Sequence, residues 1–286
     1  PVAGQFVAQA DFVIFCKSFR RDVRRVQRLV ESAMAHNRDG IPIVLSVPAD
    51  DAPLFRDALP AGSVELVHDQ AIVAAHPQAG ALHLLRRYES TPGSYAQQVV
   101  KSEAWRLLGC ASYLCADSDT VFLRPFSRAD FLTAAGHPYT VMHQSREFLQ
   151  LALDRGQGKV VEHFMAESAR VKDFFERDGP HYDFGPQPLL WSARVWNDLH
   201  EQWFAPRGWT LWDAIEQFPT EIRWYGEALL NLRSIPLDPI EPLFRVYHYD
   251  WQHDVMRSLG ETPQRVAQQY IGAVYQSNWE IDLDPP

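Results

Sequence analysis

Short apolar runs alternate with amphipathic segments through the first part of the chain. Three continuous apolar runs predict buried strands: Asp11–Cys16, Ile41–Val47 and Val64–Val67. Between the first two runs, apolar residues recur at helical spacing, which predicts a helix that begins at Asp22 and ends before Gly40. A shorter helix is expected over Asp50–Leu59. This alternation is typical of a parallel sheet covered by helices, and it predicts an α/β fold.

A further helix and strand lead to an unusual polar pattern. Tyr95–Leu108 is expected to be the helix, and the apolar run Tyr113–Ala116 the strand. The strand stops at Asp117 and Asp119, and a second apolar run closed by Pro125 follows at once. Buried strands normally avoid aspartate, and two neighbouring carboxylates repel each other unless a cation lies between them. The pattern predicts a divalent metal with oxygen ligands at the rim of the sheet, and a solvated turn after an edge strand is the alternative.

The pattern is less regular elsewhere. Residues 70–92 are mixed in pattern and end in Ser90-Thr91-Pro92-Gly93, and a loop over the site is expected there. The predicted strands are Tyr139–His143, Leu189–Trp191 and a final strand, Leu243–Tyr249. The predicted helices are Val160–Arg177, one that runs from a Ser192 cap to about Trp203, Leu211–Phe218, one with Glu227 in its first turns, and a closing helix at Thr262–Val274. The end of the chain, Asp282–Pro286, is expected to be frayed.

Composition narrows the class of protein. The chain has 286 residues, of which 46% are apolar, and is expected to form a single domain over residues 1–286. Because it begins with Pro1, origin from a larger multidomain protein is an open alternative. A net charge of −9 argues against nonspecific nucleic-acid binding. We expect no transmembrane segment, since no apolar run reaches about 18 residues, and a cytoplasmic location, since no secretory signal is recognisable. The three cysteines lack zinc-type spacing and are expected to be buried free thiols.

Polar and cationic residues follow the predicted strands at the ends where parallel sheets bind ligands. Lys17 and Ser18 come directly after the first strand. Gln97 and Lys101 lie four residues apart and therefore share one face of the helix that precedes Asp117. Either lysine could place positive charge near a bound phosphate. Ordinary strand-end residues and a solvated surface lysine are the alternatives.

The Asp117-Ser118-Asp119 sequence, placed after a buried strand and a lysine-bearing helix, resembles the nucleotide-sugar glycosyltransferases of the GT-A fold. The resemblance covers roughly residues 11–250. It implies a Rossmann-related, mixed but mostly parallel sheet flanked by helices. It further implies a nucleotide-binding half at about residues 11–130 and an acceptor-binding half at about residues 131–286.

Three later features fall in the order of that family. The loop Gly185-Pro186-Gln187 resembles the one that faces the donor sugar. Glu227 resembles the acidic motif beside the acceptor, although the family commonly has Glu-Asp there and this chain has Ala228 as the second residue. His248 resembles the histidine that completes the metal shell.

These residues define an expected site for a nucleoside-diphosphate sugar, in first place a UDP-sugar. The expected cofactor is Mn²⁺ or Mg²⁺, which would act as a Lewis acid on the leaving diphosphate, with ligands Asp117, Asp119 and His248. Asp119 is the first choice for a direct ligand, and an imidazole nitrogen favours manganese over calcium. The residues expected to bind the nucleotide and donor are Lys17, Ser18, Gln97, Lys101, Asp117, Ser118, Gly185 and Gln187.

The acceptor is expected to be a saccharide or a lipid-linked glycan, and the second would place the protein at the inner membrane face. Its hydroxyl needs a base, Glu227 or Asp183, and a base at Glu227 would favour inversion.

One alternative function is a sugar-phosphate nucleotidyltransferase. Such an enzyme would need a glycine-rich loop after the first strand, where Cys16–Arg21 has no glycine. Another is a non-catalytic saccharide-binding domain that retains the fold. Two roles are open for Trp191 and Trp224: packing in the core, or a sugar platform, which is an aromatic surface against which a sugar ring packs.

Overall fold

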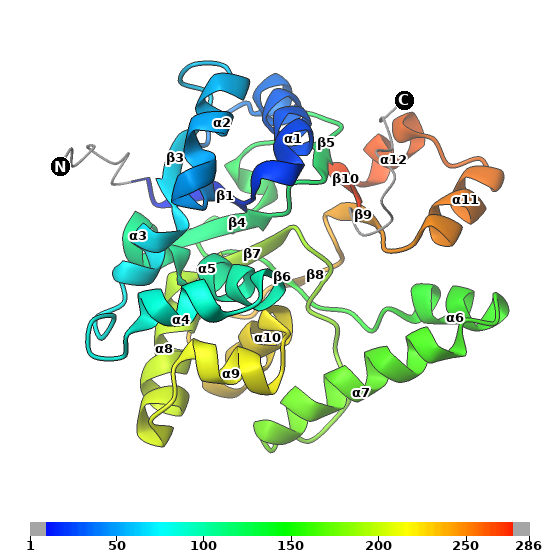
Figure 1. Cartoon of the computed structure of the whole chain (residues 1–286). Coiled ribbons are helices and arrows are strands. Elements are labelled where there is room, and N and C mark those ends of the chain that lie inside the picture. The colour runs from blue at the N-terminus through cyan, green and yellow to red at the C-terminus, as the bar shows by residue number, and fades with distance from the viewer. Residues whose placement is uncertain (1–9, 277–286) are drawn as a thin grey trace.

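A five-stranded sheet forms the centre of the protein. The computed structural model describes residues 10–276. In the order of the sheet, the strands are β3 (Glu65–His68), β2 (Ile43–Val47), β1 (Phe12–Lys17), β4 (Ser112–Ala116) and β7 (Leu189–Ser192). The first four are parallel, and β7 runs antiparallel to β4 (Figure 1). The predicted α/β class and mostly parallel central sheet are confirmed.

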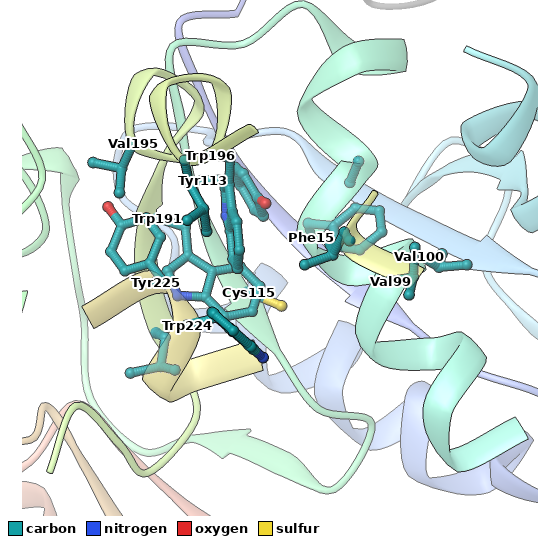
Figure 2. Packing of buried hydrophobic residues seen from close by; sticks show 14 of the residues in the cluster. Phe15, Val99, Val100, Tyr113, Cys115, Trp191, Val195, Trp196, Trp224 and Tyr225 are labelled. Atoms are coloured by element: carbon teal, nitrogen blue, oxygen red, sulfur yellow. The ribbon is translucent and has the colours of Figure 1, made fainter. Parts of the chain in front are cut away.

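The alternation of side chains along β1 divides the core into two faces. Val13 and Phe15 belong to one apolar cluster, whereas Phe12 and Ile14 belong to another on the opposite face. The first face is covered by α5 (Gly93–Leu108), α8 (Ala193–Leu199), α9 (Leu211–Gln217) and α10 (Glu221–Leu232). The second face is covered partly by α1 (Val23–His36) and α2 (Ala52–Ala58). Figure 2 shows the first cluster, where Trp191, Trp196, Trp224 and Tyr225 gather beside Tyr113.

A second, three-stranded sheet completes the opposite face. In it, β10 (Gly272–Tyr275) lies between β5 (Thr120–Phe122) and β9 (Phe244–Tyr247). The predicted closing helix over Thr262–Val274 is therefore wrong in its second half, because only α12 (Pro263–Gln269) is helical. Pairing with two distant strands overrides the helical pattern. Gly272 fits this position closely, since a Cβ there would lie 2.3 Å from the carbonyl oxygen of Val121.

Two other predictions need correction. The loop expected within residues 70–92 is interrupted by two helices, α3 (Asp69–Ala74) and α4 (Leu84–Ser90). Glu227 lies in the second turn of its helix, because α10 begins at Glu221 and not near Trp224 as expected. The Ser192 cap is confirmed, since its side chain accepts from the Arg194 N–H, but the helix continues after Leu199 as a π-helical turn.

The remaining elements surround the end of the sheet at which β1 and β4 finish. They are the short strands β6 (Thr140–Val141) and β8 (Pro239–Ile240) and the helices α6 (Arg146–Asp154), α7 (Gly158–Phe174) and α11 (Asp250–Ser258). Helices α6 and α7 form a hairpin that projects from the body (Figure 1). Among the described residues, no helix is both long enough and apolar enough to cross a membrane. The single-domain interpretation of residues 1–286 stays a prediction, and the frayed end expected at Asp282–Pro286 lies outside the described residues.

Close packing at Gly226 gives a first testable prediction. A Cβ at this position would lie 2.0 Å from the ring of Phe184. Alanine in a helix interior gains about 1 kcal/mol over glycine, but a contact this short forces α10 and Phe184 apart. We therefore expect Gly226→Ala to lower the free energy of unfolding by about 1–3 kcal/mol in urea denaturation. Gly93→Ala is the matched control because no atom lies within 4 Å of its added Cβ; an equal loss in both variants would contradict the packing argument.

Candidate functional site

A pocket of about 370 Å³ opens at the carboxyl end of β4. Its walls are α5, the loop before β7, the start of α10, helix α7 and the segment after β9. Seven of the residues predicted from the sequence line it: Gln97, Lys101, Asp117, Asp183, Gly185, Gln187 and His248. The structure thus brings together residues that are up to 151 positions apart in the chain (248 − 97).

Lys101 is the centre of the polar network in this pocket. Its ammonium Nζ lies 2.6 Å from Asp117 Oδ1, 3.0 Å from Gln187 Oε1 and 3.8 Å from Glu221 Oε1. Burial alone would lower the pKa of Lys101, but the charges of Asp117 and Glu221 raise it above its ordinary value. Burial also raises the pKa of the Glu221 carboxyl, against the opposing effect of Lys101. Lysine and glutamate are almost never fully buried without a partner, so the pocket depends on this pairing.

The Asp117-Ser118-Asp119 turn sends its side chains in different directions. Asp117 faces the pocket, where 26% of its side chain is exposed. The Ser118 hydroxyl donates to Asp22 Oδ2 at 3.1 Å, and Asp22 pairs with Arg25. Asp119 is buried directly before β5 and does not line the pocket. Ser118 and Asp22 therefore anchor the turn to the segment before α1.

Asp183 is held by contacts at both of its carboxylate oxygens. Oδ1 accepts the Gly185 N–H at 3.0 Å, and Oδ2 accepts the Ser145 hydroxyl. His143 adds a second link, because its Nε2 lies 2.6 Å from the Gly185 carbonyl oxygen and its backbone pairs with Asp183. These contacts close the base of the α6–α7 hairpin. The hairpin in turn supplies Phe148, Phe164 and Glu167 to the pocket wall.

Lys17 and Ser18 lie outside the pocket lining. The ammonium of Lys17 lies 3.0 Å from Oδ2 of Asp69, a fully buried carboxylate that also accepts from Ser46 and Tyr88. Ser18 is buried beside it. In this conformation Lys17 neutralises Asp69 and ties β1 to α3.

Glu227 also lies outside the pocket lining. It is 1% exposed, and its carboxylate accepts two hydrogen bonds from Arg177, Nε to Oε2 at 2.5 Å and Nη2 to Oε1 at 2.9 Å. Arg177 also donates to the carbonyl oxygens of Asp178 and Pro180. Glu227 thus fixes the segment after α7 against α10.

Four functional candidates in the pocket were not predicted from the sequence: His163, Glu167, Glu221 and Arg223. His163 and Glu167 are four residues apart on a predicted helix and therefore share one face, which is a signal that the sequence offered. Glu167 Oε2 accepts from Arg223 Nε at 3.2 Å, and both side chains line the pocket. Glu221 carried no comparable signal, since its burial depends on Lys101 and Gln187.

The three expected metal ligands do not form a resident metal site as they stand. Asp117 and His248 line the pocket but Asp119 does not. Burial lowers the pKa of His248, which favours the neutral imidazole that a metal needs. Within residues 10–276, however, no three His, Cys, Asp or Glu side chains are grouped closely enough to hold a metal ion. A divalent cation here would need further oxygen ligands from a bound molecule.

A larger pocket of about 920 Å³ adjoins the first and shares Phe148, Pro186 and His248 with it. It lies between α6, β9 and α11 and carries both carboxylates and arginines, among them Glu147, Glu241, Arg146 and Arg245. Phe148 also stacks on Tyr249 at the boundary, with ring centroids 6.3 Å apart and planes 4° from parallel. Together the two pockets can hold two polar molecules that meet at His248.

Comparison with known proteins places the chain in a family. No curated protein matches the sequence. The family of unknown function DUF6492 matches residues 13–257, a range that includes every lining residue of the first pocket except Gln276. The chain therefore belongs to the DUF6492 family.

Proposed function

We propose that the protein is a glycosyltransferase that moves a sugar from a nucleoside-diphosphate sugar, a UDP-sugar in first place, to a saccharide or lipid-linked acceptor. The observation that carries the proposal is the pocket at the end of β4, where Asp117, Lys101 and the Gly185–Gln187 loop meet. A mostly parallel sheet with carboxylates at this end agrees with the GT-A resemblance. Because one fold carries many functions, the proposed function follows from the residues of the site.

The two pockets suit the two substrates of such a reaction. The donor belongs in the smaller pocket, where Gln97, Asp117 and Gln187 offer polar groups for the nucleotide and sugar. The acceptor belongs in the larger pocket, and the boundary at Phe148 and His248 is where a hydroxyl would meet the anomeric carbon. Mn²⁺ or Mg²⁺ is proposed to enter with the diphosphate rather than to reside in the free protein. The proposed location is cytoplasmic, and a lipid-linked acceptor would bring the protein to the inner membrane face.

The acceptor hydroxyl needs a base in reach of the pocket. Glu227 lies outside it, and both oxygens of Asp183 are engaged by the hairpin contacts. Glu167 has the most exposed side chain of the four lining carboxylates, 35% against 26%, 14% and 9% for Asp117, Asp183 and Glu221. We therefore propose that Glu167, which lines the smaller pocket, is the base for an acceptor hydroxyl that reaches in from the larger pocket, with Arg223 holding the Glu167 carboxylate. Inversion of the anomeric carbon stays a prediction.

Nucleotide binding tests the proposal directly. Calorimetry with UDP, GDP, ADP and CDP, each with Mn²⁺ and with EDTA, is expected to find one nucleoside diphosphate that binds at least tenfold more tightly with the metal. Asp117→Asn is expected to weaken that binding at least tenfold, because the carboxylate that faces the pocket becomes an amide. Asp254→Asn changes a side chain that is 81% exposed and is the matched control, with no expected effect.

Three outcomes would count against the proposal. Binding of none of the four nucleotides, with or without metal, would refute a nucleotide-sugar site. Metal-dependent binding without any hydrolysis or transfer of the corresponding nucleotide sugars would favour the non-catalytic saccharide-binding alternative. Release of pyrophosphate from a nucleoside triphosphate and a sugar phosphate would instead identify a nucleotidyltransferase.

A further inference from the structure

The ammonium of Lys101 occupies a position that resembles a cation site. Oxygens from three separate segments surround it: Asp117 after β4, Gln187 before β7 and Glu221 at the start of α10. Two carboxylates and an amide carbonyl are the ligand types that hard divalent cations prefer. Here they are drawn together by an amino group that the chain itself supplies from α5.

Two of the residues around this ammonium, Gln187 and Glu221, are buried with it and are linked to each other by a hydrogen bond. Lys101 is 4% exposed and Glu221 6%. Gln187 uses both ends of its amide, accepting from Lys101 and donating Nε2–H to Glu221 Oε1 at 2.9 Å. The Glu221 N–H is held in turn by Gln98 Oε1 at 3.2 Å, so the start of α10 is fixed to α5. A neutral side chain at position 101 would leave two neighbouring carboxylates without their compensating charge.

We propose that Lys101 is the resident cation of this pocket and that it excludes divalent metal from Asp117 in the free protein. The pairing already engages Asp117, one of the two expected metal ligands that line the pocket. It follows that the protein alone binds divalent ions weakly, and that metal enters only with a ligand that brings its own oxygens. The last step depends on the proposed function, whereas the exclusion of metal by Lys101 does not.

The affinity of the protein for Mn²⁺ in the absence of nucleotide tests this inference. Water-proton relaxation or calorimetry measures it. Lys101→Met removes the ammonium and keeps a long apolar side chain. The two carboxylates then lack a counter-charge, so this variant is expected to bind Mn²⁺ at least tenfold more tightly than the unaltered protein. The gain is expected to disappear in Lys101→Met/Asp117→Asn. Lys159→Met, a change on the exposed start of α7, is the matched control and should leave Mn²⁺ binding unchanged.

The inference fails if Lys101→Met binds Mn²⁺ no more tightly than the unaltered protein, or if the gain persists without the Asp117 carboxylate. Should Lys101→Met not fold, the unaltered protein decides the question. Its Mn²⁺ affinity without nucleotide should not change in Asp117→Asn, and tight binding that Asp117→Asn abolishes would overturn the inference. Failure to bind any nucleoside diphosphate would count against the proposed function only, because these measurements contain no nucleotide.

Discussion

Replacing Glu227 by alanine is expected to lower the free energy of unfolding by about 3–5 kcal/mol, which is typical of removing one partner from a buried ion pair. The Glu227 carboxylate and the Arg177 guanidinium share two hydrogen bonds, and their side chains are 2% and 14% exposed. Without the carboxylate, a guanidinium charge stays buried and the segment after α7 loses its anchor. Urea unfolding followed by tryptophan fluorescence measures the loss.

Two further variants separate the ion pair from other effects. Arg177→Met/Glu227→Met removes both charges and is expected to recover part of the lost stability, because no unpaired charge remains. Asp198→Ala breaks a pair in which Arg194 is 71% exposed, and the expected change is under about 1 kcal/mol. Equal losses for Glu227→Ala and Asp198→Ala would contradict the buried-pair argument.

The same position tests the role of base that the sequence suggested. We expect Glu227→Gln to lower stability while retaining turnover at a temperature where the variant is folded, since Glu227 lies outside the pocket. A stable Glu227→Gln with no turnover would instead support Glu227 as the base. Stability and turnover must therefore be measured on the same sample.

The sequence predicted the elements that are defined by local pattern. Continuous apolar runs identified β1 and β4 because strands buried on both faces contain few polar residues. Apolar residues at helical spacing identified α1 and α5, because a helix that covers a sheet is apolar on one face. Asp117 stood out because a carboxylate directly after a buried strand is unusual, and it does line the pocket.

Pairs between distant residues could not be predicted in this way. Lys17, directly after a predicted strand, and Lys101, on the predicted helix before Asp117, were both candidates for phosphate binding in the sequence. In the structure Lys17 pairs with Asp69, whereas Lys101 meets three oxygens inside the pocket. The residue types carry no information about which carboxylate each lysine meets, because the order of the strands and the packing of α10 decide it.

Glu227 illustrates a different failure. The sequence suggested a helix that began near Trp224, which placed Glu227 in the first turns and near a ligand. Helix α10 begins three residues earlier (224 − 221), so the carboxylate that enters the pocket is Glu221. An error of about one helical turn in the predicted start of α10 therefore assigns the wrong glutamate to the pocket. Helix ends are the positions least constrained by local pattern.

Trp224 shows how the core holds α10 in that position. Its side chain is fully buried, and its indole N–H donates to the Phe218 carbonyl oxygen at 3.0 Å. Its ring contacts the rings of Phe174 at 4.9 Å and Phe204 at 5.5 Å between centroids. Figure 2 shows the indole among the core side chains. Trp224 is therefore a core residue, and the sugar platform that the sequence left open does not apply to it.

Trp224→Ala is expected to lower the free energy of unfolding by about 3–5 kcal/mol, since a buried indole is lost and a cavity remains between α7 and α10. Urea unfolding measures the change. Trp224→Phe should lose clearly less, because a ring still fills part of the space. Trp251→Ala is the matched control, a partly exposed tryptophan on α11 for which less than half of that loss is expected. Because Glu221 and Arg223 lie on the same helix and line the pocket, Trp224→Ala should also weaken nucleotide binding. Unchanged stability in Trp224→Ala would mean that α10 is held mainly by the ion pairs of its two glutamates.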